Sequence, residues 1–338
     1  MKSPKLPPPA VAVVCFLAVA ALARAEPEKE RAPDRKDAAA EWAQLQADFS
    51  PDRRGAKGAM ERAEAAKRFY AAHPESPGAV RARKMEVMAL LEAAGNRDAQ
   101  AAQRFQTAAT AIRADTTLPE ADRAEISGYW YFQQALAQAR HQRELPERIE
   151  AGARRLVAEF PRQPQGYETL LTVAGWSPDH RAVELLRELV ASAAPETVKH
   201  SARLRLTLLA LPGQRLPDVL ADTAMAGQLT GLDRPVVLYS WASWSPESVA
   251  LANFLGQRKA AGAVWIGINL DTDTVAAAAE VQRGSFPGTQ VFAGPDGPLA
   301  RRLGLDQLPL VILADAQGVI RDIHGKESLE TKLAALGL

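Results

Sequence analysis

The feature that most constrains the fold of this chain is a change in its sequence pattern near residues 211–213. Before this point, apolar residues recur at steps of three and four, as in Trp42, Leu45 and Phe49, which is the period of helices that bury one face. After it, short runs rich in β-branched residues alternate with helical stretches. The sequence therefore predicts an α+β multi-domain chain, with an all-α part followed by an α/β part.

The α/β part divides into short predicted elements. We expect strands at residues 236–240, 264–270, 290–292, 310–313 and 319–323, and helices at residues 246–261, 274–283, 299–303 and 328–336. The last two strands are joined by Asp315-Ala316-Gln317-Gly318, which suits a tight turn. The pattern predicts a mixed sheet that ends in an antiparallel hairpin and a closing helix.

Proline-containing joints divide the helical part. Residues 71–78, AAHPESPG, and residues 158–165, AEFPRQPQ, each follow one predicted helix and precede another. These joints resemble the helix–helix joints of tetratricopeptide-like arrays, although their separation is not a multiple of that repeat. We therefore predict a helical-hairpin array over residues 38–212. A true tetratricopeptide domain and a plain helical bundle both remain open.

The N-terminus has the pattern of an export signal. Lys2 and Lys5 precede an apolar run at residues 11–22, and small residues at positions 23 and 25 suit a signal peptidase. The run is short for a membrane span. We predict a signal peptide at residues 1–25, cleaved between Ala25 and Glu26, then a polar linker at 26–37, with an uncleaved anchor as the alternative. The processed protein would lie in the periplasm or cell envelope without a membrane span.

Charge and cysteine content exclude several functions. The 41 basic and 40 acidic residues give a net charge of +1, so we expect no nucleic-acid partner. Cys15 is the one cysteine, and it lies in the predicted signal peptide. Cleavage would leave no thiol in a compartment where cysteines usually form disulfides or act as redox reagents.

Three stretches of the α/β part carry a family resemblance. They are residues 234–256, RPVVLYSWASWSPESVALANFLG; residues 262–271, GAVWIGINLD; and residues 308–320, LPLVILADAQGVI, followed by His324-Gly325. Their order and spacing resemble TlpA-type thioredoxin-like proteins, which are thiol-disulfide oxidoreductases with a W-A-x-W, C-x-x-C active-site pattern. The resemblance implies a thioredoxin-like α/β/α sandwich with a mixed sheet over residues 213–338. It does not extend to the helical part.

The resemblance places Ser245 and Ser248 at the family's two cysteine positions. Thiol–disulfide exchange needs an attacking thiolate and a second, resolving thiol, and a serine hydroxyl forms no disulfide. Tyr239 stands where thioredoxin carries a buried acid. We therefore expect no catalytic residue here. Ser245, Pro246 and Glu247 instead suit a helix start, with a Ser cap, Pro at the first position and Glu in the first turn.

Other site chemistries lack their residues. A serine nucleophile needs a nearby histidine, and the family pattern places His324, the one histidine of this part, in the last strand. The remaining histidines show no pairing at helical spacing, so we expect no metal and no cofactor. They are His73, His141, His180 and His200.

A peptide groove is the remaining candidate site. The resemblance implies that Pro309 follows a cis peptide bond beside the active-site loop, where the family presents a backbone edge to an extended peptide. The candidate groove residues are Trp241, Trp244, Pro246, Glu247 and Pro309. The alternative is that these residues only stabilise the fold.

Three functional hypotheses follow. The first is an exported, redox-inactive thioredoxin-like protein that binds proteins or peptides through the groove and the helical array, as a chaperone-like module does. The second is a TlpA-like thiol-disulfide oxidoreductase by family descent. The third is a structural assembly subunit.

Overall fold

The computed structural model describes residues 36–49, 58–95, 98–221, 223, 225, 229, 233–258, 262–324 and 329–335. The predicted signal peptide and nearly all of the predicted linker lie outside these residues. The chain forms two compact units, Met1–Gly166 and Tyr167–Leu338, and each is described by itself. No helix among the described residues is long and apolar enough to cross a membrane.

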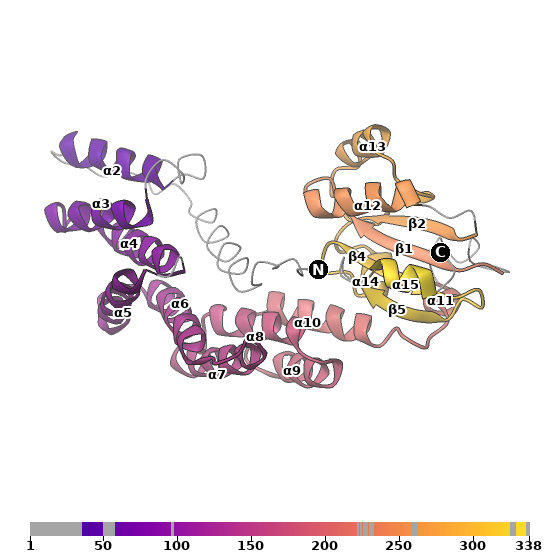
Figure 1. Cartoon of the computed structure of the whole chain (residues 1–338), viewed down its shortest axis with the longest axis horizontal. Coiled ribbons are helices and arrows are strands. Elements are labelled where there is room, and N and C mark those ends of the chain that lie inside the picture. The colour runs from indigo at the N-terminus through magenta and orange to yellow at the C-terminus, as the bar shows by residue number, and fades with distance from the viewer. Residues whose placement is uncertain are drawn as a thin grey trace, which may run out of the picture. The chain divides into compact units, whose positions relative to one another are not determined.

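The first unit is an array of helices in which each helix packs against the next (Figure 1). Helix α4 also contacts α6, as expected where successive hairpins stack. The predicted helical-hairpin array is confirmed, whereas a true tetratricopeptide domain stays a prediction. The elements are α2 (Lys36–Asp48), α3 (Ala59–Ala72), α4 (Gly78–Gly95), α5 (Ala99–Ala114), α6 (Glu120–Gln138), the 3-10 helix η2 (Gln142–Glu144) and α7 (Leu145–Glu159).

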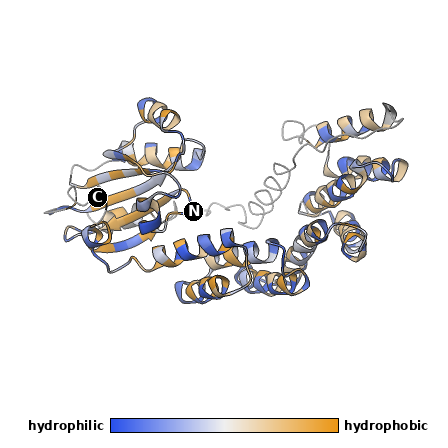
Figure 2. Cartoon of the chain, turned by 180° about the vertical axis from the view of Figure 1, so that it is seen from behind, coloured by the Kyte–Doolittle hydropathy of each residue, from blue (hydrophilic) through white to orange (hydrophobic). Residues whose placement is uncertain are grey.

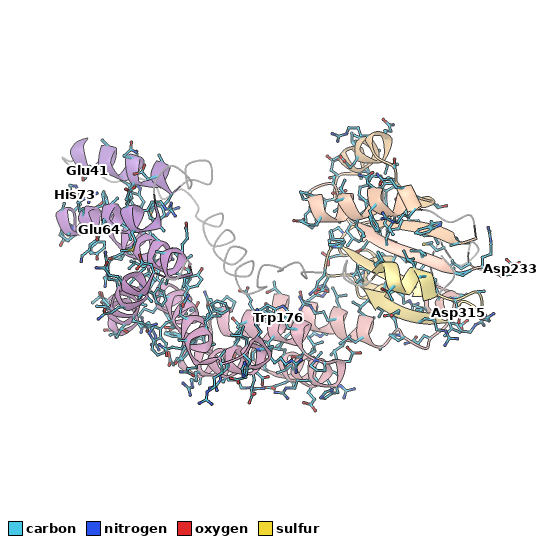
Figure 3. The ribbon with its side chains drawn as sticks, in the orientation of Figure 1. Glu41, Glu64, His73, Trp176, Asp233 and Asp315 are labelled. Atoms are coloured by element: carbon cyan, nitrogen blue, oxygen red, sulfur yellow. The ribbon has the colours of Figure 1, made fainter. Side chains whose placement is uncertain are left out.

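The two predicted proline joints share one backbone geometry. His73 ends α3 with φ −128° and ψ 58°, and Phe160 ends α7 with φ −133° and ψ 66°. In each, the backbone N–H donates to the carbonyl four residues earlier, at 2.9 Å. Helices α3 and α7 are two hairpins apart in the chain, which accounts for the long separation of the joints. His73 also contacts Glu41 of α2, with 3.0 Å between Nε2 and Oε2, and is therefore a joint residue (Figure 3).

The second unit begins within α8 and ends in the α/β part. The predicted strands and helices of residues 236–336 are all present, with ends shifted by at most a few residues. The elements are α8 (Gln165–Trp176), α9 (Asp179–Ala191), α10 (Glu196–Leu209), α11 (Leu216–Val219), β1 (Val236–Trp241), α12 (Pro246–Arg258), β2 (Val264–Asn269), α13 (Thr274–Arg283), β3 (Thr289–Phe292), α14 (Pro298–Leu303), β4 (Leu310–Ala314), β5 (Ile320–His324) and α15 (Leu329–Ala335).

The sheet is mixed and has the strand order β3-β2-β1-β4-β5. Strands β1, β2 and β3 are parallel, whereas β4 runs antiparallel to both β1 and β5. The β4–β5 turn contains Gly318 at φ 77°, a left-handed conformation that glycine adopts without strain. The predicted mixed sheet with a C-terminal hairpin is confirmed.

Strand periodicity gives the sheet two apolar faces. Figure 2 shows hydrophobic residues along the strands of the sheet. On β1, Val237, Tyr239 and Trp241 pack toward α12, α13 and α15. Val236 and Leu238 point to the opposite face, where α11 and α14 complete the core. Helices therefore cover both faces, which confirms the predicted α/β/α sandwich.

Helix α10 also packs against α14, so part of the helical segment lies in the same compact unit as the sheet. The boundary predicted at residue 212 rests on the change in secondary structure, which is a different criterion from compactness. The predicted domain limits therefore stay predictions.

Candidate functional site

The loops that follow the parallel strands meet at one edge of the sheet, which we call the carboxyl edge. Strands β1, β2 and β3 end there, and the antiparallel β4 begins there, because Ser240 of β1 pairs with Leu310 of β4. The loops at this edge are residues 242–247, 270–275, 292–297 and 304–309. Ligands of open α/β sheets bind at such an edge.

Ser245 and Ser248, at the family's cysteine positions, are built into the start of α12. The Ser245 carbonyl accepts from the backbone N–H of Ser248 and of Val249, at 3.0 and 3.1 Å. The Ser248 hydroxyl accepts from Ala242 N at 3.1 Å and donates to the Ser245 carbonyl at 2.9 Å. Both serines are buried. These contacts agree with the predicted scaffold role of the two residues.

A neutral hydrogen-bond network lies on β1, directly before the loop of residues 242–247. Tyr239 donates to the Pro287 carbonyl at 2.8 Å and accepts from Gln290 Nε2 at 2.7 Å, while Trp241 Nε1 donates to Gln290 Oε1 at 3.0 Å. Burial raises the pKa of Tyr239 above its ordinary value, so its hydroxyl stays protonated. Gly267 leaves room for this network, because a Cβ there would lie 2.0 Å from Gln290 Oε1. The position at which thioredoxin carries a buried acid is therefore held here by the neutral hydroxyl of Tyr239.

Asp271 fixes the loop that presents Trp244. Its carboxylate accepts from Ser243 N at 2.9 Å, from Ser243 Oγ at 2.9 Å and from Asn269 Nδ2 at 2.7 Å. The Asp271 and Asn269 side chains are buried. Trp244, next to Ser243, is 67% exposed. The hydrogen bonds of Asp271 therefore hold the backbone of this loop in place, while the indole ring of Trp244 is exposed to solvent.

Replacing Asp271 with Ala is expected to lower the free energy of unfolding by about 2–3 kcal/mol, because Ser243 N and the buried Asn269 amide lose their acceptor. Urea unfolding followed by tryptophan fluorescence measures this loss. Asp273→Ala is the matched control. It removes only the cap of α13, and we expect a loss of about 1 kcal/mol. Equal losses in both variants would contradict the assigned role of Asp271.

The structure distributes the predicted groove residues unequally. Trp244, Pro246 and Glu247 are exposed, and Pro309 is partly exposed. The peptide bond between Leu308 and Pro309 is cis, as the resemblance implied. Trp241 is a correction to the predicted groove, because its side chain is 0% exposed and packs against Phe286.

Two more apolar side chains are exposed at the carboxyl edge. Val275, at the start of α13, is 76% exposed, and Phe292, at the end of β3, is 45% exposed. The sequence analysis missed both. Their position directly after predicted strands was the available signal, since such positions share an edge with the Trp244 loop.

One histidine lies against a loop of the carboxyl edge. His200 lies 3.3 Å from Asp296 in an exposed pair. Among the described residues, no group of three or more His, Cys, Asp or Glu side chains could hold a metal ion. The described residues also contain no cysteine.

The strand order and the helices on both faces of the sheet give the C-terminal third of the chain a thioredoxin-like fold. Over 122 residues the chain is 31% identical to the thiol:disulfide interchange protein DsbE of Escherichia coli, and the same holds for DsbE of Shigella flexneri. The match covers 36% of this chain and 61% of each relative's length. A comparison with models of protein families finds no match.

Solved structures of similar proteins include a putative DsbE from Chlorobium tepidum, with 26% identity over 31% of this chain and 81% of that chain. A thiol-disulfide oxidoreductase from Bacteroides fragilis is 25% identical over 37% of this chain and 98% of its own. Both TM-scores are 0.28. At this level the fold assignment rests on the strand order and directions described above.

Proposed function

We propose that this protein is an exported, redox-inactive thioredoxin-like protein that binds extended peptide segments at the carboxyl edge. One observation carries the proposal: Trp244 is 67% exposed on a loop that buried hydrogen bonds hold in place. A large aromatic ring that is exposed on a loop with a fixed backbone is a typical anchor of protein and peptide interfaces.

The surroundings of Trp244 favour an apolar segment as the ligand. Val275, Phe292 and Pro309 lie at the same edge, so exposed apolar surface extends over several adjacent loops. A single exposed apolar residue needs no explanation, whereas several at one edge favour an interaction surface.

The charge of the carboxyl edge favours neutral or cationic peptides. The four loops at this edge contain no Lys, Arg or His, whereas Glu247, Asp273 and Asp296 are exposed in them. Opposite charge on the ligand would increase its rate of association, and like charge would disfavour binding.

The proposed location is the periplasm or cell envelope. It rests on the sequence pattern of residues 1–25, which has the features of a cleaved export signal. The helical array would supply a second binding surface on the same chain. Oxidoreductase activity, which the names of the relatives describe for those proteins, would need thiols at positions 245 and 248.

Replacing Trp244 with Ser is expected to weaken peptide binding by about tenfold or more, the usual effect of removing an aromatic anchor. The measurement is fluorescence anisotropy of a labelled, unstructured synthetic peptide of alternating Leu and Ser with terminal Lys residues. Trp176→Ser is the matched control, since Trp176 is an exposed tryptophan of α8 (Figure 3). Equal affinities of the natural chain and the Trp244 variant, or an equal loss in the control, would refute the proposal.

A further inference from the structure

Arg205 of α10 connects the helical segment to the loop that leads to Pro309. Its Nε donates to Asp306 Oδ2 at 2.8 Å, and its Nη1 donates to the Leu171 carbonyl of α8 at 2.8 Å. The side-chain oxygen of Gln307, in the amide orientation that satisfies its neighbours, accepts from Arg205 Nη2 at 2.5 Å. One guanidinium group thus joins two helices and two consecutive loop residues.

The Arg205–Asp306 ion pair is largely removed from water. The side chains of Arg205 and Asp306 are 18% and 6% exposed. Burial raises the pKa of the Asp306 carboxyl above its ordinary value, while Arg205 acts in the opposite direction. Asp306 Oδ1 has no hydrogen-bond partner among the described residues. Arg205 is therefore the main group that offsets the burial of the Asp306 carboxylate, and His200 acts in the same direction.

A second, independent contact holds the same loop against α10. Gly304 has φ +66°, and a Cβ added there would lie 2.2 Å from the Leu204 carbonyl and 2.6 Å from Leu208 N. The chain therefore passes the α10 backbone at a distance that only glycine permits. At its other end, Leu310 N donates to Ser240 Oγ at 3.1 Å. Residues 304–310 are thus fixed at both ends, with Arg205 between them.

We propose that Arg205 is a positioning residue for the carboxyl edge: it holds residues 304–309 on α10 and so places Pro309 beside the Trp244 loop. The inference rests on the proposed peptide binding and goes beyond it, because it makes α10 a determinant of peptide affinity. A partner that engages α8 or α10 would then act on the peptide site through Arg205.

The test replaces Arg205 with Met in the full chain. Arg203→Met is the matched control, because Arg203 lies on the same helix, is 51% exposed and forms an ion pair with the exposed Glu196. Under native conditions we expect hydrogen exchange of residues 304–310 to rise by about tenfold or more, while β1 and β2 keep their protection. Affinity for the Leu-Ser-Lys peptide should fall by about tenfold. Arg205→Lys keeps the positive charge but loses the planar guanidinium group. This variant should recover part of the protection from hydrogen exchange and part of the peptide affinity.

The readouts separate the possible failures. Exchange that stays within about twofold of the natural chain, or that rises equally throughout the unit, would overturn the positioning role. If the natural chain does not bind the peptide, the proposed function fails, while local exchange still decides the role of Arg205. Should Arg205→Met not fold, adding Asp306→Asn removes the orphaned charge, and the double variant is measured in the same way.

Discussion

A chain that carries Ser245→Cys and Ser248→Cys is expected to gain thiol–disulfide exchange relative to the natural chain. Both positions lie at the start of α12, where the positive end of the helix dipole stabilises a thiolate. The Ser248 hydroxyl already points back toward residue 245, with 2.9 Å between Ser248 Oγ and the Ser245 carbonyl. The two substitutions therefore place the two thiols that the exchange requires at the start of a helix that is already formed.

Insulin reduction in the presence of dithiothreitol measures this gain, and the double variant should exceed the reductant background by about tenfold or more. Each single cysteine variant is a control, because one thiol attacks but cannot resolve the mixed disulfide. We expect activity below that of a thioredoxin with a buried acid, since Tyr239 is neutral. Activity in the natural chain processed at Ala25 would refute the redox-inactive assignment.

The order of the elements could be predicted because it depends on local patterns. The alternation of apolar strands with helices gave the limits of β1 through α15 to within a few residues, and the turn at residues 315–318 identified the final hairpin. The start of α12 was also predictable, since Ser-Pro-Glu suits a helix start without reference to the rest of the chain.

Side-chain direction and long-range pairing could not be predicted in the same way. Trp241 is the last residue of β1, and strand alternation turns its ring into the core, whereas Trp244 lies beyond the strand and reaches solvent. The Arg205–Asp306 pair joins residues 101 positions apart. No periodicity in a single sequence relates such residues, because their contact arises from the packing of α10 against α14.

Replacing Gly267 with Ala is expected to destabilise the thioredoxin-like domain strongly. The added Cβ would lie 2.0 Å from Gln290 Oε1 and 2.7 Å from the Tyr239 hydroxyl oxygen, closer than any real Cβ contact. Gln290 cannot move away freely, because it bonds both Tyr239 and Trp241. The substitution therefore adds overpacking to the loss of buried hydrogen bonds, a combined cost of about 3–5 kcal/mol.

Thermal unfolding measures this loss, and Gly262→Ala is the matched control, because no described atom lies within 4 Å of a Cβ there. We expect the control to stay within about 0.5 kcal/mol of the natural chain. Adding Gln290→Ala to Gly267→Ala should recover part of the loss, since it removes the closest clash while leaving the Trp241 N–H without its acceptor. No recovery would mean that the clash with Tyr239 dominates. Equal stability of Gly267→Ala and Gly262→Ala would show that the hydrogen-bond network of Tyr239, Trp241 and Gln290 tolerates a side chain at residue 267. The network would then not be a rigid support for the loops of the carboxyl edge.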